Sequence, residues 1–224
     1  FALTSRNRIP PTGGLGSSSA AIVGALLVAN VAAGRPMDAD GLLALASELE
    51  GHADNVAPAM LGGLVVVVAE GGGRPIALSL PVPPELSAVV FVPSFSMPTR
   101  RARQLLPSVV PRRDAVFNAG RTALLVAALQ AGRPDLLRVA TQDRLHQPYR
   151  SRMFPAMPSV IEAALEAGAC GACLSGAGSA LLALAVDRHS QIGEAMQRAA
   201  ESRGVNGRWF AADIARSGAV VEEG

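Results

Sequence analysis

Aromatic side chains are scarce in this sequence: Phe, Trp and Tyr make up 4% of the 224 residues. Proteins that bind single-stranded nucleic acid stack bases on exposed aromatic rings, so this scarcity argues against that function. An excess of one charge is lacking as well, because 20 Lys and Arg residues stand against 18 Asp and Glu residues, for a net charge of +2. Dedicated nucleic-acid-binding domains are strongly basic, and we expect no nucleic-acid partner.

Cysteine and histidine are rare too, which limits metal and redox chemistry. The two cysteines form one Cys-x-x-Cys pair, Cys170 and Cys173, and the histidines are His52, His146 and His189. Zinc needs four ligands, and a redox pair starts a helix after a strand, whereas this pair runs into an apolar, glycine-rich strand. We interpret the two residues as buried structural cysteines; a redox couple and half a zinc site are the alternatives.

A long apolar run is also missing. The first ten residues contain Arg6 and Arg8 and have no apolar core of a signal peptide. The apolar segment at 20–33 is interrupted by Gly24 and Asn30 and is shorter than the roughly 20 residues that cross a bilayer. Half of the residues are hydrophobic, so the chain has a core. We expect a cytoplasmic protein of one large or two modest domains, without a membrane partner.

Residues 13–19 read Gly-Gly-Leu-Gly-Ser-Ser-Ser and precede the alanine-rich segment at 20–33. This order predicts a tight loop that leads into a helix. Glycines let a ligand approach the backbone, and the first helical turn offers unpaired N–H groups and about half a positive elementary charge. Such a loop can seat a phosphate, and its hydroxyls can bind a metal ion. The alternative is a Ser-capped helix after a glycine turn.

Residues 48–58 form a second polar stretch, Glu-Leu-Glu-Gly-His-Ala-Asp-Asn-Val-Ala-Pro. They follow a predicted helix that begins at Asp38 or Asp40 and has leucines at helical spacing. They precede a predicted buried strand, residues 62–68. Polar side chains between a helix end and a core strand often line a cleft, and a solvated turn is the alternative reading.

The rest of the chain intersperses helices with short strands, which indicates an α+β fold with an antiparallel sheet and helices on one face. The Gly- and Pro-rich stretch 71–84 suggests a domain boundary near Val82, and 76–80 within it could be a short strand. A long helix at 114–131 should bury Val116. We further expect helices at 134–145, 160–167 and 189–203, and strands at 88–92, 180–186, 208–212 and 219–222.

Two arginine-bearing segments and a third glycine stretch complete the candidate functional residues. Thr99 and Arg103 are four residues apart and could share one helix face, or belong to a solvated basic turn. Arg150 has no local partner in the sequence and is either a surface residue or a carboxylate clamp. Residues 175–179, Ser-Gly-Ala-Gly-Ser, lie between two short predicted strands, where a close approach of two backbones is plausible.

Taken together, these stretches resemble the GHMP kinase superfamily and, within it, the homoserine kinase family. Residues 10–19 resemble the Pro-x-x-x-Gly-Leu-Gly-Ser-Ser-Ala loop of the superfamily, with Ser19 where Ala is usual. Residues 175–179 resemble its C-terminal glycine motif, with Ser179 where Pro is usual. Residues 48–58 and 146–150, the latter His-Gln-Pro-Tyr-Arg, resemble homoserine kinase segments. The resemblance covers nearly the whole chain.

The resemblance implies the two-domain GHMP kinase fold, with an ATP-binding domain at 1–82 and a C-terminal, ferredoxin-like domain at 83–224. It implies ATP-dependent phosphorylation of the L-homoserine hydroxyl in threonine biosynthesis, with Mg²⁺ held by Ser18 and Glu48. The implied ATP-binding residues are Pro10, Gly13, Gly14, Leu15, Gly16, Ser17, Ser18 and Ser19. The implied substrate residues are His52, Asp54 and Asn55 near the amino alcohol, Thr99, Arg103 and Arg150 near the carboxylate, and Gly176 and Gly178.

The resemblance leaves the catalytic base open. Asn55 stands where other GHMP kinases often have an aspartate, which allows direct attack by the hydroxyl, and Asp54 is the alternative base. The family's first segment, with an Asn-Leu-Gly-Pro-Gly-type stretch, is not found, and the chain begins with Phe1. We therefore expect a partial sequence that is poorly active or prone to aggregation by itself. Another small-molecule GHMP kinase of mevalonate or sugar type, and an incomplete nucleotide-binding fragment, are the alternative functions; a homodimer remains open.

Overall fold

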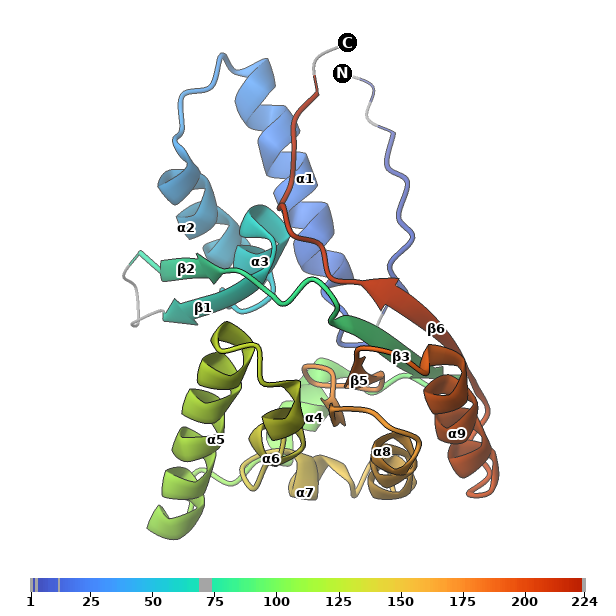
Figure 1. Cartoon of the computed structure of the whole chain (residues 1–224). Helices are drawn as coiled ribbons and strands as arrows, with labels where there is room; N and C mark the ends of the chain where they lie inside the picture. Colours follow the sequence, from blue (N-terminus) through green and yellow to red (C-terminus); the bar gives the residue numbers. More distant parts are fainter. Residues whose placement is uncertain (1, 3, 12, 69–73, 223–224) are drawn as a thin grey trace. The chain divides into compact units, whose positions relative to one another are not determined.

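A computed structural model describes residues 2, 4–11, 13–68 and 74–222. The chain divides into two compact units (Figure 1). Unit 1 comprises Phe1–Pro11, Gly16–Val82 and Ala215–Gly224, and unit 2 comprises Thr12–Leu15 and Pro83–Ile214. Unit 1 holds α1 (Ser17–Ala32), α2 (Ala39–Glu50), α3 (Val56–Leu61), β1 (Leu64–Val68) and β2 (Ile76–Leu80).

Unit 2 holds the remaining elements of the described chain. These are β3 (Ser87–Pro93), α4 (Thr99–Gln104), α5 (Arg112–Gln130), the 3-10 turn η1 (Pro134–Leu136), α6 (Leu137–Ala140), α7 (Gln147–Arg150), α8 (Met157–Glu166), β4 (Gly171–Leu174), β5 (Leu181–Ala185), α9 (His189–Glu201) and β6 (Gly207–Asp213).

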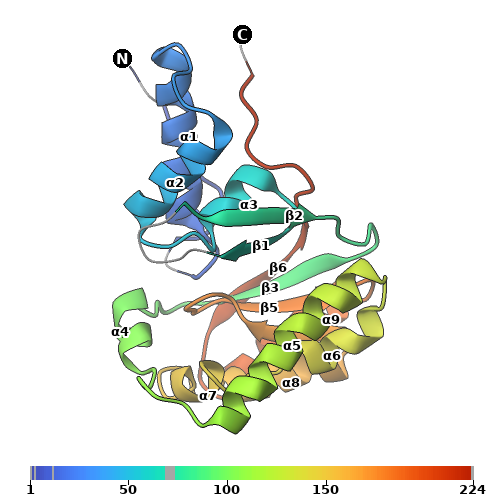
Figure 2. The same cartoon turned by 90° about the vertical axis from the view of Figure 1, so that its left-hand side faces the viewer.

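In unit 1, three helices pack on one face of a two-stranded antiparallel ribbon (Figure 2). Asp38 caps α2, because its side chain accepts a hydrogen bond from the N–H of Gly41. The core joins Val23 of α1, Leu43 and Ala46 of α2 and Val56 of α3 to Val65 and Val67 of β1. The helices predicted after the glycine loop and after Asp38 are confirmed.

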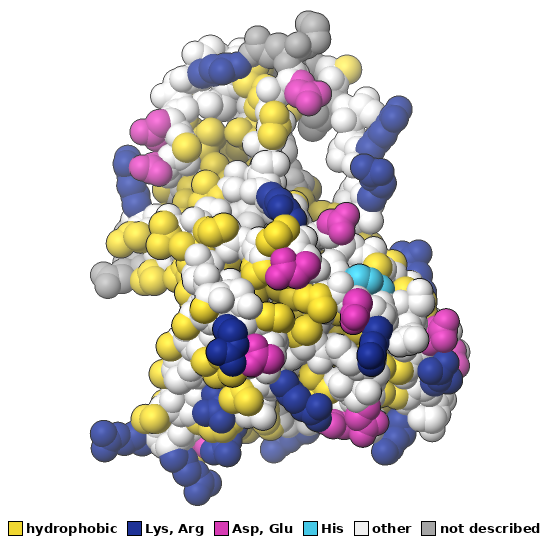
Figure 3. Space-filling model, viewed as in Figure 1, with side chains coloured by type: hydrophobic (Ala, Val, Ile, Leu, Met, Phe, Trp, Pro, Cys, Tyr) yellow, Lys and Arg dark blue, Asp and Glu magenta, His cyan; other side chains and the backbone are white. Residues whose placement is uncertain are grey.

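The strand predicted at 62–68 is present as β1, but it is not buried on both faces. Its side chains alternate, as in a strand with one face in water. Val66 lies opposite Leu78 and Val68 opposite Ile76, and these four side chains are 38%, 58%, 56% and 75% exposed. Figure 3 shows apolar side chains at the surface over this ribbon. The continuous apolar sequence of β1 concealed this alternation.

In unit 2, a four-stranded antiparallel sheet has the order β4-β5-β3-β6. Helices α6, α8 and α9 lie on one side of it (Figures 1 and 2). Val89 and Phe91 of β3 point into this side and pack with residues of α8 and α9. On the other face, Leu15 packs against Ala88, Val90 and Ala180. The α+β class with an antiparallel sheet and helices on one face is therefore confirmed.

Three predicted details of secondary structure are wrong. The helix predicted at 134–145 ends at Ala140, and the chain restarts as α7 at Gln147. Val116 is 63% exposed, because α5 buries its C-terminal residues, Ala128 and Leu129, instead. Residues 219–222 form no strand: the N–H of Ala219 bonds to the carbonyl of Ala59, which belongs to helix α3 and not to a strand, so no ladder can form there.

Candidate active site

The N-terminus of α1 in unit 1 has the features of a phosphate seat. Gly16, its N-cap residue, adopts a φ of 76°, and no described side chain caps the first turn. The first turn contains no acidic residue, and the hydroxyl of Ser17 accepts a hydrogen bond from Asn7 Nδ2 at 2.7 Å. The first N–H groups of this 16-residue helix therefore remain available, and the helix dipole favours an anion there.

Glu50, at the C-terminus of α2, faces the serines of α1. Ser18 Oγ and Ser19 Oγ both donate to Glu50 Oε1, at 2.6 and 2.8 Å, and Ser19 is fully buried. Glu48, which the family resemblance assigns to Mg²⁺ together with Ser18, is exposed. The physical reason is helical periodicity: Glu50 lies four residues after buried Ala46 and shares its face, whereas Glu48 lies two residues after it, on the opposite side. The structure thus pairs Ser18 with Glu50 instead of Glu48.

The turn between α2 and α3 brings three of the predicted residues together. His52 Nδ1 and Asp54 Oδ1 are 2.6 Å apart, and Asn55 Nδ2 donates to the same oxygen at 3.3 Å. The His52–Asp54 approach lacks hydrogen-bond geometry, so it is an ion pair only when His52 is protonated. A Cβ on Gly16 would lie 3.5 Å from Asn55 Oδ1, which places Asn55 beside the start of α1. Pro10 lies in the irregular segment before that helix.

In unit 2, the glycine loop lies directly on the third glycine stretch. The N–H of Ala180 donates to the carbonyl of Gly13 at 3.0 Å, and Ser175 Oγ donates to the carbonyl of Gly14 at 2.9 Å. Gly14 has a φ of 76°, and a Cβ there would lie 2.1 Å from the Ser175 carbonyl oxygen. The approach of the two backbones expected at this stretch is therefore real, and it requires glycine at position 14.

Arg150 is a buried charged residue of unit 2, with 8% exposure. Its Nη1 donates to the carbonyl of Gly176 at 2.8 Å and contacts His146 Nδ1 at 3.1 Å. Its Nε is buried and has no hydrogen-bond partner among the described residues. Burial lowers the pKa of Arg150, the carboxylate of Asp143 raises it and the nearby charge of Arg103 lowers it further. Arg103 and Thr99 share the exposed side of α4, as predicted.

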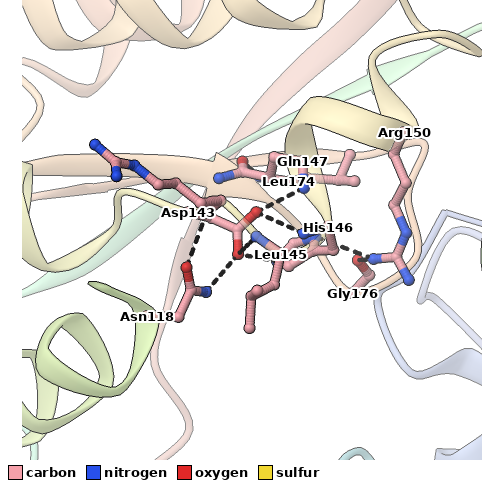
Figure 4. Close-up of polar contacts among 9 residues, drawn as sticks. Asn118, Asp143, Leu145, His146, Gln147, Arg150, Leu174 and Gly176 are labelled. Atoms are coloured by element: carbon pink, nitrogen blue, oxygen red, sulfur yellow. Dashed lines mark hydrogen bonds and ion pairs between the residues drawn. The ribbon is translucent and has the colours of Figure 1, made fainter. Parts of the chain in front are cut away.

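Asp143 holds the segment that carries Arg150 (Figure 4). Its carboxylate accepts hydrogen bonds from the N–H groups of Leu145, His146 and Gln147, at 3.2, 2.8 and 2.7 Å, and from Asn118 Nδ2 at 2.6 Å. Burial alone would raise the pKa of Asp143, but these hydrogen bonds outweigh it and lower the pKa.

Sequence reasoning missed Asp143 and Asn118. An Asp a few residues before a Pro in a first helical turn is a helix-start signal, and Asp143 before Pro148 shows it. Asn118 carries no comparable signal, because it contacts Asp143 across 25 residues of chain.

Comparison with known proteins decides the family. The family model for the GHMP kinases N terminal domain matches residues 1–63, and the model for the GHMP kinases C terminal matches residues 125–205. The homoserine kinase of Persephonella marina is 41% identical over 216 residues, which cover 96% of this chain and 72% of that protein. The chain belongs to the homoserine kinase family. The homoserine kinase of Carboxydothermus hydrogenoformans is 47% identical over 204 residues, covering 91% of this chain and 65% of that protein.

This homoserine kinase family member also shares its fold with a solved relative. The crystal structure of homoserine kinase from Cytophaga hutchinsonii superposes with a TM-score of 0.87 at 32% identity, covering 95% of this chain and 69% of that one. The family predicted from the sequence is confirmed. The chain spans 65% and 72% of the length of the two curated relatives. Among the described residues, no helix has the length and hydropathy of a membrane span.

Proposed function

We propose that this homoserine kinase family member transfers the γ-phosphoryl group of ATP to the side-chain hydroxyl of L-homoserine, which yields O-phospho-L-homoserine and ADP. The choice of a substrate with a carboxylate rests on the buried Arg150, whose Nε has no hydrogen-bond partner among the described residues. A buried donor without a partner costs about 1–3 kcal/mol, so the structure retains it at a cost that a bound ligand would remove.

A carboxylate is the ligand that suits this arginine. Because Nη1 is engaged by Gly176 and His146, the edge formed by Nε and Nη2 is left for a bidentate partner, and a carboxylate matches that edge. Arg103 adds a second positive charge close enough to affect the pKa of Arg150. An α-amino acid and mevalonate both supply the required carboxylate, whereas a sugar does not. The 47% and 41% identity to curated homoserine kinases favours the amino acid over mevalonate. Thr99, four residues before Arg103, offers a hydroxyl to the same group.

The polar turn of unit 1 fits the amino alcohol part of homoserine. The exposed carboxylate of Asp54 can accept from an ammonium group. Asn55 Nδ2 and His52 Nδ1 both lie near its Oδ1, which leaves Oδ2 for such a group. Asn55 cannot remove a proton from the hydroxyl, so the phosphoryl group is attacked by the hydroxyl directly. Asp54 is the alternative base. Phosphoryl transfer requires positioning and charge neutralisation more than covalent chemistry by the protein.

ATP is bound through its phosphates by the glycine–serine stretch, residues 13–19, with the first turn of α1 supplying N–H donors. The hydroxyl of Ser18 and the carboxylate of Glu50 fit Mg²⁺, which prefers oxygen ligands and keeps several waters and phosphate oxygens. Among the described residues, no group of three or more His, Cys, Asp and Glu side chains could hold a metal ion. Ser18 and Glu50 would therefore be the residues that hold Mg²⁺ together with the nucleotide. When bound, Mg²⁺ neutralises charge on the phosphates.

Phosphorylation of L-homoserine and of mevalonate, each followed by ³¹P NMR with Mg-ATP, tests this proposal. We expect transfer to homoserine only, and Arg150→Met to raise the homoserine KM about 100-fold, because charged hydrogen bonds contribute about 1.5–3 kcal/mol each. The KM for ATP should stay within twofold. Arg152→Met, on the exposed neighbour in the same turn, is the matched control and should change neither constant. Transfer to mevalonate but not to homoserine would overturn the proposal.

A further inference from the structure

The contact between Arg150 and His146 fixes the protonation of the histidine ring. A guanidinium group only donates hydrogen bonds, so His146 Nδ1 at 3.1 Å must accept from Arg150 Nη1. The ring proton then resides on Nε2. Burial and the charge of Arg150 lower the pKa of His146, while Asp143 raises it, and the net direction is downward. The neutral ring with its proton on Nε2 is therefore the form that this contact requires.

Asp143 favours that same tautomer. Its Oδ1 lies 3.6 Å from His146 Nε2, so its negative charge faces the ring nitrogen that carries the proton. The side chain of Asp143 is only 6% exposed, and its carboxylate also receives the backbone N–H of His146. One carboxylate thus fixes both the position of His146 and the direction in which its ring presents a lone pair.

The second acceptor of Arg150 is fixed from the same short helix. Gln147, the first residue of α7, accepts a hydrogen bond from the N–H of Leu174 at 2.8 Å through Oε1. Leu174 ends β4, two residues before Gly176, whose carbonyl accepts from Arg150. The N–H of Gln147 itself is bound by Asp143. Both acceptors of the Arg150 Nη1 group therefore depend on the position of α7, which Asp143 sets.

We propose that His146 and Asp143 are positioning residues for Arg150. They turn its Nη1 group toward the protein and leave the Nε edge, which has no described partner, for the substrate carboxylate (Figure 4). Neither residue needs to touch the substrate. The inference rests on the proposed function, because it assigns the carboxylate of homoserine to Arg150.

A double-mutant cycle on the full chain tests the proposal by calorimetric titration with L-homoserine. His146→Leu removes the acceptor and should weaken binding about 10-fold, as expected for losing a hydrogen bond to a charged group. His146→Asn restores a short acceptor and should recover most of the affinity. In the Arg150→Met background, His146→Leu should have no further effect, because the residue that it positions is gone.

Asp143→Asn is the second arm. The asparagine side chain keeps one acceptor oxygen but places its NH₂ group among N–H donors. The substitution should therefore weaken homoserine binding only when Arg150 is present. If this variant unfolds, the His146 cycle alone still decides. His189→Leu, the loss of another histidine of unit 2, is the control and should leave affinity unchanged. A non-hydrolysable ATP analogue should bind all variants equally.

The outcomes separate the two proposals. If Arg150→Met binds homoserine like the unmodified chain, the proposed function fails. If Arg150→Met loses affinity but His146→Leu does not, or if the two losses simply add, the positioning role is refuted and the proposed function stands. Equal losses for His146→Leu and His146→Asn would also refute the positioning role, since the acceptor would then be irrelevant.

Discussion

Replacing Gly14 by Ala should detach the glycine loop from the turn at residues 175–178. The added Cβ would lie 2.1 Å from the carbonyl oxygen of Ser175, and a backbone atom cannot turn aside as the end of a flexible side chain can. The φ of 76° at Gly14 adds a second penalty, because this backbone region costs an L-residue about 1–2 kcal/mol. The loop must therefore move or unit 2 must deform.

The expected loss of stability is bounded from two directions. Deforming the contact costs about 1–3 kcal/mol for overpacking in addition to the backbone penalty. Detaching the loop instead forfeits two hydrogen bonds, Ala180 to Gly13 and Ser175 to Gly14, at about 0.5–1.5 kcal/mol each. It also exposes Leu15, whose half-buried side chain contributes about 1 kcal/mol. Deformation thus costs about 2–5 kcal/mol and detachment about 2–4 kcal/mol, and because the cheaper route is taken, the expected loss of stability is about 2–4 kcal/mol.

Urea unfolding followed by the fluorescence of Trp209 measures this loss. Trp209, the single tryptophan, lies in β6 and packs against the core of unit 2, so it reports on that unit. Gly204→Ala is the matched control for the backbone penalty: its φ is 73°, but no described atom lies within 4 Å of the added Cβ. Gly120→Ala, in α5 with no such contact either, should stabilise by about 0.5–1 kcal/mol.

The comparison between Gly14→Ala and Gly204→Ala isolates the backbone contact. The former should be less stable by at least about 1 kcal/mol, the lower bound for overpacking. It should also bind a non-hydrolysable ATP analogue at least tenfold more weakly, whereas Gly204→Ala should bind it normally. Equal stability and equal nucleotide affinity of the two variants would show that the loop does not depend on this contact.

Three further predictions follow from the remaining geometry. Glu50→Gln should weaken Mg-ATP binding at least tenfold, as expected for losing a carboxylate ligand, while Glu48→Gln should change the affinity by less than twofold. Calorimetric titration measures both affinities. A larger loss for Glu48→Gln than for Glu50→Gln would show that Glu48 is the metal ligand. The affinity for homoserine should fall as the pH drops through the lowered pKa of His146, because the protonated ring loses its acceptor and places a charge beside Arg150. Titrations between about pH 5 and pH 8 should show this loss in the unmodified chain but not in His146→Asn. The same pH profile for both proteins would contradict the prediction. Burial raises the pKa of the Cys173 thiol to about 11, while the residue stays partly exposed, so in Cys170→Ser this thiol should react with a disulfide reagent at least about tenfold more slowly than in the urea-unfolded chain. Equal rates in the folded and the unfolded chain would contradict the raised pKa.

Local patterns in the sequence identified most of the fold. The helix after the glycine loop, the helix after Asp38 and the strands at 88–92 and 208–212 are all present, because their caps and periodicity act within a few residues. The interruption of the helix at 134–145 was not predicted. It depends on a buried carboxylate, Asp143, whose partner Asn118 comes from a different helix, and such tertiary contacts override local propensity.

The sequence was enough to predict which residues belong to the candidate site, but less so which of them contact each other. Two glutamates, Glu48 and Glu50, stand in the same short motif, and only the rotation of α2 against its core decides which of them reaches Ser18. The expectation that Arg150 has no local partner is wrong, because His146, four residues before it, contacts its Nη1 group. Its real contacts, His146 and the carbonyl of Gly176, include a backbone group 26 residues away, which no side-chain pattern could reveal.

The hydrogen bond from Ser175 to Gly14 joins residues that are 161 positions apart in the chain. During synthesis, the loop at residues 13–15 therefore leaves the ribosome long before its partners at 175–180 exist. Unit 1 has the same property, since the N–H of Gly63 bonds to the carbonyl of Ala215 and the carbonyl of Ala59 accepts from the N–H of Ala219, both of which are synthesised much later. Contacts between residues so far apart in the chain slow folding, because the entropy cost of closing a long loop comes before the favourable contacts form. The nascent chain is thus left with an unfinished nucleotide loop until residues 175–180 have been synthesised, and chaperones can bind the exposed apolar surface during that period.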